Sequence, residues 1–399
     1  MNAYQRVSLF GQITLLLAST LTVMAGATIA PGLPAMQAAF AAEENADFLV
    51  RLVLTLPALF IVLGAPLAGF LIDRFGRKRL LLFSAILYAA AGSSGFFLDS
   101  LMLILIGRAL LGFAVGGIMT SVTTLIADYF TGEDRARLLG LQASFMALGG
   151  VLFLLFGGLL ADSSWRYPFL IYLFPLLLLP FIVFTLFEPA RQNKEPADAP
   201  NIFDFLRSHP ALTIIFALAF LGMTTFFMIP VQLPFHLQSI SDASGTQSGI
   251  VIAASNLFSA LVALQYKRFR RRLNFVQIFA VAFALMAAGF AVIGLADNYW
   301  LVLTGSAICG LGIGFLLPNS TSWLTAIVPE TLRGRAVGGL TMAVFLGQFV
   351  SPLYSQPLGT AVGVGNSFLM IAAVLLLIAG LAALGSFKSS NYESECVPG

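Results

Sequence analysis

The sequence predicts an all-α integral membrane protein with twelve transmembrane helices in two pseudo-symmetric six-helix bundles. Three observations carry this prediction: an extreme apolar composition, twelve apolar runs of membrane-spanning length, and sequence features that repeat at half the chain length. Of the 399 residues, 59% are hydrophobic and 10% are charged, whereas soluble domains carry roughly 25% charged residues. So few charges cannot cover a water-exposed surface of this size. The runs are also too long and continuous for the alternating strands of an outer-membrane barrel.

The apolar runs define the expected helices in order. The first run, from about Leu9 to Leu33, is longer than the apolar core of a signal peptide, so we interpret it as the first spanning helix. The runs that follow are each about 20 residues long, as a bilayer requires, and most are separated by short turns. The expected spans are centred near Leu21, Ile61, Leu87, Phe113, Leu148, Leu177, Leu218, Asn256, Ala284, Gly312, Phe345 and Ala373.

The longest polar stretch lies between the sixth and seventh expected spans. It begins at Glu188 and is rich in proline and charged residues, which is typical of a linker. Residues 201–208 within it are expected to form a short amphipathic helix on the membrane surface. The predicted organisation is an N-terminal bundle (1–187), a linker (188–209), a C-terminal bundle (210–386) and a tail (387–399).

The basic residues set the expected orientation. With both termini in the cytoplasm, 18 of the 21 Lys and Arg residues fall in cytoplasmic segments, as the positive-inside rule requires. Only Arg51 and Arg166 fall on the other side, and Arg108 lies within a span. We therefore expect a multi-pass protein of the plasma (inner) membrane, with both termini cytoplasmic, that functions as a monomer.

The two halves share features at a spacing of 198 residues. A common offset near half the chain length indicates duplication, and parallel repeats of this kind build some transporter folds. The residues of the first half are Gly107, Gly112, Gly116, Arg135, Arg137, Gly140, Leu148 and Gly149, and their counterparts are Gly305, Gly310, Gly314, Arg333, Arg335, Gly338, Leu346 and Gly347.

A short hydrophilic turn at residues 69–79, GFLIDRFGRKR, lies between the second and third spans. A positively charged cytoplasmic turn would explain its basic residues, but not Gly69, Asp73 and Gly76 at their spacing. The run Gly69-x-Leu71-x-Asp73-Arg74-x-Gly76-Arg77-Lys78 resembles the loop signature of the major facilitator superfamily, between transmembrane helices 2 and 3. Together with the twelve spans, the linker and the repeat, the resemblance covers nearly the whole chain and implies the major facilitator fold.

The resemblance also implies a role for this loop as a latch between the two halves in one state of transport. In the family, an arginine of the loop pairs with an acid at the cytoplasmic end of helix 4; here these residues are Arg77 and Asp128. The alternative is a set of static surface pairs, each worth roughly 0 to 1 kcal/mol. The residues of the predicted conformational switch are Gly69, Asp73, Arg74, Gly76, Arg77 and Asp128.

The second half lacks a good copy of this loop. Residues 266–272 keep the positive charge but contain no Asp, so any latch is expected to be asymmetric. We interpret their basic cluster as an orientation signal and a contact with lipid headgroups.

Arg108 is the only charged residue well inside an expected span. An arginine at the centre of a spanning helix costs about 2.5 to 3.5 kcal/mol on insertion scales, so its side chain should face the bundle interior or a water-filled cavity. The run Gly107-Arg108-x-x-x-Gly112-x-x-x-Gly116 resembles the helix-4 motif of drug:proton antiporters, which implies a role in proton coupling or substrate binding. The alternative is a structural arginine that satisfies backbone carbonyls. Its repeat partner is Ser306, and Gly112 and Gly116 are expected to pack helices closely.

Other parts of the sequence bear on the substrate. The fifth span keeps Gly157-Gly158 but has Phe153-Leu154 where such antiporters carry a Gly-Pro pair. All eighteen acids can be placed outside the apolar centre. Because an isolated cation in hydrocarbon is costly, a neutral or anionic amphipathic substrate is expected. The expected cavity lining is polar and uncharged, with Thr28, Thr120, Gln232, Asn256, Asn319, Trp323, Gln348 and Tyr354.

The expected function is secondary active transport: proton-linked efflux of a small organic compound by alternating access. A proton gradient would drive it without a bound cofactor, and the carrier of the proton would be a rim acid, His236 or the substrate itself. The alternatives are an uptake symporter for a small organic nutrient and a non-transporting membrane sensor. No nucleophile–base pair, metal cluster or phosphate loop predicts an enzyme. The expected partners are the substrate and the lipid bilayer, with no nucleic acid.

Overall fold

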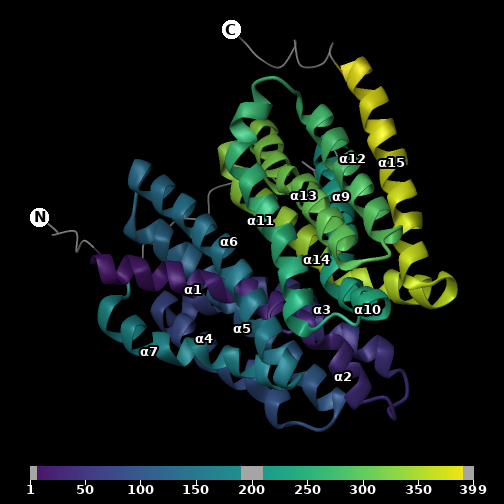
Figure 1. Ribbon diagram of the computed structural model, residues 1–399. Coiled ribbons are helices and arrows are strands. Elements are labelled where there is room, and N and C mark those ends of the chain that lie inside the picture. The colour runs from purple at the N-terminus through teal and green to yellow at the C-terminus, as the bar shows by residue number, and fades with distance from the viewer. Residues whose placement is uncertain (1–6, 190–209, 390–399) are drawn as a thin grey trace, which may run out of the picture. The chain divides into compact units, whose positions relative to one another are not determined.

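The computed structural model describes residues 7–189 and 210–389, with side chains to residue 385, and all regular secondary structure in these parts is helical (Figure 1). Twelve helical stretches in them are long and apolar enough to cross a membrane. The twelve predicted spans and the all-α membrane fold are thereby confirmed. Residues 190–209 lie outside the described part, and so does the short helix expected at 201–208.

The described helices form two compact units. The first comprises residues 1–194 together with 243–253, and the second comprises residues 195–242 and 254–399. The helices of the first unit are α1 (Leu9–Ala27), η1 (Ala30–Gly32), α2 (Leu33–Ala39), α3 (Ala46–Phe75), α4 (Arg77–Phe97), α5 (Leu101–Tyr129), α6 (Gly132–Ser163), η2 (Tyr167–Leu173) and α7 (Phe174–Thr185).

The second unit holds most of the remaining helices, and α11 begins in the segment grouped with the first unit. Their bounds are α9 (Pro210–Phe226), α10 (Met228–Ser241), α11 (Gly245–Arg270), α12 (Phe275–Gly294), α13 (Tyr299–Ile327), α14 (Glu330–Val362) and α15 (Val364–Ser389).

Three of the spans are interrupted where proline removes a backbone donor. Pro31 lies in η1, between α1 and α2, and Pro175 lies at the start of α7, directly after η2. Pro230 follows the junction of α9 and α10. A proline cannot donate to the carbonyl four residues earlier, so each interruption leaves backbone groups that need other partners.

The central helix of each unit packs through glycine at equivalent positions. A Cβ added at Gly112 of α5 would lie 2.4 Å from the carbonyl oxygen of Pro57 in α3. A Cβ at Gly310 of α13 would lie 2.3 Å from the carbonyl oxygen of Ser255 in α11. Because both pairs are offset by 198 residues, Pro57 and Ser255 occupy equivalent places in the repeat. A Cβ at Gly116 would lie 3.4 Å from the backbone of α3, so α5 keeps this close approach over a full turn.

Candidate functional site

The turn between α3 and α4 is built around Gly76, whose φ of 95° and ψ of 163° belong to a region that is essentially open only to glycine. Glycine also makes room for a remote carboxylate, because a Cβ here would lie 2.6 Å from Oε1 of Glu188. That carboxylate accepts hydrogen bonds from the backbone N–H groups of Arg77, at 2.7 Å, and Lys78, at 2.9 Å. These donors begin α4 and have no partner within the helix. Glu188 therefore caps α4 with the charge that its N-terminus favours.

Two further side chains hold the segment that carries Glu188. Lys78 donates from Nζ to the carbonyl oxygens of Val183, at 2.8 Å, and Leu186, at 2.7 Å. The hydroxyl of Tyr129, at the end of α5, bonds to both backbone groups of Phe187. The end of the sixth span is thus fixed to the turn that begins the third.

The structure brings together one charged pair of the predicted switch. Nε of Arg77 lies 3.0 Å from Oδ2 of Asp128, and both side chains are partly buried. The N–H is not aimed at that oxygen, so the contact is an ion pair without a hydrogen bond. Asp73 is exposed on α3 and bonds to no other described residue. A Cβ at Gly69 would meet no atom within 4 Å, so no contact within the described units requires glycine there. Arg74 places its guanidinium 5.5 Å from the ring centre of Phe75.

Arg108 of α5 is fully buried inside the first unit. Its Nε donates to the carbonyl oxygen of Val53, at 2.7 Å, and its Nη2 donates to that of Ala25, at 2.5 Å. The guanidinium carbon lies 5.1 Å from the ring centre of Tyr172, whose hydroxyl also donates to Ala25, at 3.1 Å. The arginine therefore ties α5 to α1, α3 and η2.

Both carbonyls are available because of the local sequence. Within an α-helix, Val53 would accept from residue 57, but Pro57 has no N–H. Ala25 lies in the last turn of α1, where carbonyls lack partners within the helix. Arg108 thus satisfies backbone oxygens, as the structural interpretation of this residue requires. Nη1 of Arg108 is different, because it is buried and forms no hydrogen bond in the described part of the chain.

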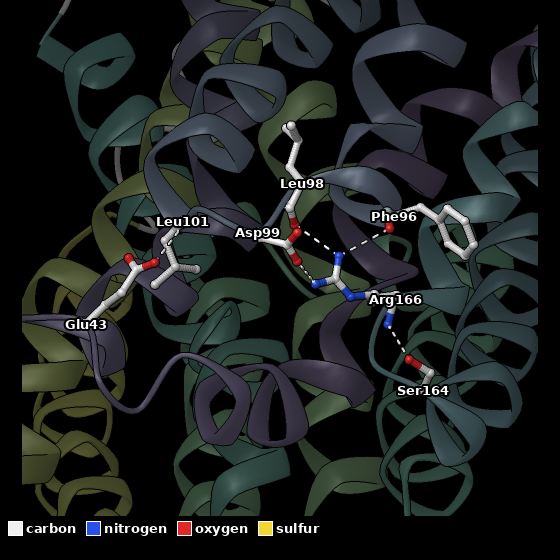
Figure 2. Close-up of polar contacts among 7 residues, drawn as sticks. All are labelled: Glu43, Phe96, Leu98, Asp99, Leu101, Ser164 and Arg166. Atoms are coloured by element: carbon white, nitrogen blue, oxygen red, sulfur yellow. Dashed lines mark hydrogen bonds and ion pairs between the residues drawn. The ribbon is translucent and has the colours of Figure 1, made fainter.

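The opposite end of α4 has a cation in the matching position. Figure 2 shows the Arg166 guanidinium at the carbonyls of Phe96, 3.2 Å away, and Leu98, 3.0 Å away, which end α4. Arg166 also forms an ion pair with Asp99 and lies 4.4 Å from the ring centre of Trp165. A cation at a helix C-terminus is favourable for the same reason as an anion at the N-terminus. Both ends of α4 are therefore capped by residues that flank η2 and α7.

A second contact in this region concerns the start of α5. In Figure 2 the carboxylate of Glu43 faces the backbone N–H of Leu101, the first residue of α5, with 3.5 Å between oxygen and nitrogen. This is a long hydrogen bond, but it again places an acid from a distant segment at a helix N-terminus.

Comparison with known proteins agrees with this architecture. The sequence model of the family described as "Major Facilitator Superfamily" matches residues 15–273 and 215–395, which together cover most of the chain. This chain is a member of the major facilitator superfamily.

Curated relatives of this major facilitator protein include exporters. It is 24% identical to the "Bacillibactin exporter" of Bacillus subtilis (strain 168), over 90% of this chain and 94% of the relative. It is 27% identical to the "Tetracycline resistance protein, class C" of Escherichia coli, over 92% of this chain and 94% of the relative. The same fold is seen in the crystal structure of a D-xylose-proton symporter, with a TM-score of 0.76, 19% identity, and coverage of 93% and 96% of the two chains.

Family membership makes the chain a multi-pass membrane transporter, which implies a bilayer environment and a small-molecule substrate. Most of the expected cavity residues of this major facilitator protein have partners in their own unit. Thr28 and Thr120 bond to carbonyls of their own helices, at 2.8 and 2.7 Å. Gln232 donates to Ser355, at 3.2 Å, and Tyr354 donates to the carbonyl of Thr224, also at 3.2 Å.

Asn319 and Trp323 of α13 also serve packing within their unit. Asn319 accepts from the hydroxyl of Tyr266, at 3.0 Å, and donates to the carbonyl of Phe275, at 2.9 Å. The Trp323 ring stacks on that of Phe275 with 5.6 Å between centres. Asn256 and Gln348 are half-buried and form no side-chain hydrogen bond with any described residue. Among the expected cavity residues, these two amides are the ones left open to a ligand.

Sequence reasoning missed three residues that shape the site. Glu188 was assigned only to the linker, although it caps α4. Tyr172 and Tyr88, fully buried around the end of α1, were not singled out; Tyr88 donates to the carbonyl of Leu21, at 2.8 Å. One signal was available for Arg108: a proline at position 57 frees the carbonyl at position 53, which a buried donor can use.

Proposed function

We propose that this transporter exports a small neutral or anionic organic compound, coupled to the proton gradient, by alternating access of its two units. The observation that carries the proposal is the charge pattern of the interior. Arg108 is fully buried, its Nη1 has no hydrogen-bond partner among the described residues, and none of the described Asp and Glu side chains is buried. A buried donor without a partner is rare enough to need an explanation, and an anionic or polar substrate group would provide one.

The absence of a buried acid among the described residues bears on the sign of the substrate. A cationic compound would have no buried counter-charge in these parts, and desolvating an isolated cation is costly. A neutral or anionic compound avoids that cost. The open amides of Asn256 and Gln348 supply neutral donors and acceptors for such a compound.

The direction of transport is supported by the relatives. Two of them carry names that state export or drug resistance, and both align with nearly the whole chain. Proton coupling belongs to the proposal as well. The groups available to carry the proton are the acids at the rims, the substrate itself, and His236, which is buried with Nε2 3.1 Å from the carbonyl oxygen of Ile293.

The decisive experiment separates the transport role of Arg108 from its structural role. In the repeat, Ser306 and Ser255 stand where the first unit has Arg108 and Pro57. The double variant Pro57→Ser/Arg108→Ser therefore copies a pair that the second unit already uses, and Pro57→Ser alone is its matched control. Wild type, the control, the double variant and Arg108→Ala would be compared in inside-out vesicles under an imposed pH gradient, with a panel of fluorescent neutral and anionic compounds.

We expect proton-driven uptake into these vesicles, which corresponds to export from the cell, by wild type and the Pro57→Ser control. The double variant and Arg108→Ala should reach the membrane and lose most of this uptake. Wild-type flux from the folded double variant would show that Arg108 is structural only, and would remove the basis of the proposal.

The runner-up function is uptake of a small organic nutrient. It is favoured by the shared fold of the D-xylose-proton symporter. The same vesicles discriminate between the two functions. A symporter carries proton and substrate in the same direction, so reversing the imposed pH gradient would drive accumulation with the opposite dependence from that of an antiporter.

A further inference from the structure

A second polar site lies in the second unit, at the C-terminal end of α11. A hollow of about 410 Å³ is lined by Tyr266, Lys267, Arg270 and Arg271 of this segment and by Ser322 of α13. The described residues of its lining therefore combine three cations with two hydroxyl groups, and no acid is among them. This composition is the opposite of the uncharged lining expected for the transport cavity.

The hydroxyl side of the hollow is held in place by hydrogen bonds. Tyr266 donates to Oδ1 of Asn319, at 3.0 Å. Asn319 in turn donates to the carbonyl oxygen of Phe275, at 2.9 Å, the first residue of α12. These linked bonds connect α11, α12 and α13 and fix the position of the Tyr266 hydroxyl.

Arg270 is held with similar precision. Its guanidinium carbon lies 3.8 Å from the ring centre of Phe275, and its Nη1 donates to the carbonyl oxygen of Leu273, at 3.1 Å. A planar guanidinium that is already oriented loses little entropy when its other N–H groups bind a ligand. The arginine therefore places an oriented positive charge at the hollow.

Lys267 and Arg271 supply exposed positive charge at the same place. Both are exposed, and neither forms an ion pair with an acid in the described part of the chain. Residues 266–272 contain five basic residues and no acidic residue. The local excess of positive charge is not neutralised by these neighbours, so a bound anion is favoured.

We propose that this hollow binds a phosphate group, carried by an anionic phospholipid or by a soluble phosphate ester. An arginine fork, a lysine and hydroxyl donors are the groups that recognise phosphate oxygens. The volume lies within the range of small-ligand sites, roughly 300 to 1,000 Å³. The side chains of Leu261 and Leu264, on the same helix, are apolar and exposed, so they could contact the chains of a bound lipid. The site is independent of the transported compound.

The test uses the full chain, purified in neutral detergent and delipidated. Phosphatidylglycerol, phosphatidylcholine and glycerol 3-phosphate are titrated separately at constant salt, and bound molecules are counted by native mass spectrometry. Lys267→Gln/Arg271→Gln removes two charges that line the hollow. Arg268→Gln/Arg272→Gln is the matched control, because it removes two exposed charges of the same segment that do not line it.

We expect phosphatidylglycerol to bind about tenfold or more tightly than phosphatidylcholine, and the hollow pair to lose about tenfold in affinity. The control pair should lose less than about threefold. Equal losses in the two pairs would mean diffuse attraction to a charged surface, and would overturn the proposal; so would no binding by wild type. Binding of phosphatidylglycerol without glycerol 3-phosphate identifies a lipid site, and comparable binding of both identifies a site for soluble esters. Unfolding temperatures without ligand verify that both variants fold.

Discussion

The third span of the first unit and its counterpart in the second begin 198 residues apart, at Arg77 and Phe275, but their first turns are satisfied differently. Helix α12 is capped locally: Asn274 accepts from the N–H of Gln277, at 2.8 Å, and Gln277 accepts from the N–H of Asn274, at 3.0 Å. Helix α4 has no side-chain cap at Gly76 and uses Glu188 instead, more than a hundred residues away.

The cap of α12 is therefore made by neighbouring residues, whereas the cap of α4 depends on tertiary structure. A capping box forms wherever its four residues form a helix start, so α12 needs no other segment there. The start of α4 requires the end of the sixth span to be in place. The first unit therefore connects its loop of charged residues, through Glu188, to the residues that lead out of its bundle.

The two units also differ in how a backbone carbonyl near their centre finds its hydrogen-bond donor. In the first unit, Pro57 leaves the carbonyl oxygen of Val53 without its helical donor, and Nε of Arg108 donates to this oxygen at 2.7 Å. In the second, the equivalent residues are Ser255, which has an N–H, and Ser306, which is buried. A cation is thus needed only in the half where a proline has removed a backbone donor.

The largest effect is expected at this pair. Arg108→Ser leaves the carbonyl of Val53 without its donor and the carbonyl of Ala25 with the Tyr172 hydroxyl alone, and should destabilise the protein by roughly 2 to 5 kcal/mol. Adding Pro57→Ser restores an N–H for Val53 and should recover about 1 kcal/mol. Denaturant unfolding in detergent, followed by circular dichroism, measures both. If Pro57→Ser lowers the stability further instead, Arg108 is not compensating for the backbone donor that Pro57 removes.

The next effect concerns Gly76, compared with Gly363. Both glycines have positive φ, of 95° and 86°, but a Cβ at Gly363 would meet no atom within 4 Å. Gly363→Ala should therefore cost only the backbone strain, about 1 to 3 kcal/mol. Gly76→Ala carries this strain and also displaces the Glu188 carboxylate, so it should cost about 1 kcal/mol more. Equal unfolding temperatures for the two variants would contradict the role of Gly76 in admitting Glu188.

Removing the N-terminal cap of α4 or α12 should have a smaller effect on stability. Glu188→Ala removes two hydrogen bonds and a favourable charge from the start of α4, for about 1 to 2 kcal/mol. Glu188→Gln should lose less, because an amide oxygen can still accept one of the bonds. Asn274→Ala should cost about 1 kcal/mol. Hydrogen exchange at the first turns of α4 and α12 reports each loss locally. Faster exchange at α12 in Glu188→Ala would show that the two starts are not independent.

The smallest effect on stability is expected for the ion pair. Asp128→Asn should cost about 1 kcal/mol or less, since both side chains are partly exposed. Its control is Glu330→Gln, which removes the exposed pair with Arg333, at 3.1 Å. If Arg77 and Asp128 belong to a switch, Asp128→Asn changes the transport rate and Glu330→Gln does not. Equal transport by both would leave the pair a static surface contact.

The sequence was sufficient for the architecture because twelve spans are encoded directly in run length and apolar composition. The Arg77–Asp128 pair followed from resemblance to family motifs. The cap by Glu188 could not be predicted, because its partners lie in another span and its own surroundings are typical of a linker. Polar residues such as Asn319 and Tyr354 were expected to face a cavity, but only the packed structure shows that neighbouring helices already use their hydrogen bonds.

The two caps of α4 also have a consequence for biosynthesis. Helix α4 packs against η2 and lies beside α7 (Figure 1). Its end carbonyls bond to Arg166 and its first N–H groups to Glu188, on either side of that span. A ribosome delivers α4 to the membrane well before it has made either residue. Until the sixth span follows, the third has unbonded ends, which water or the insertion machinery must satisfy. A chain truncated before residue 188 would hold all of α4 and still lack the acid that completes it.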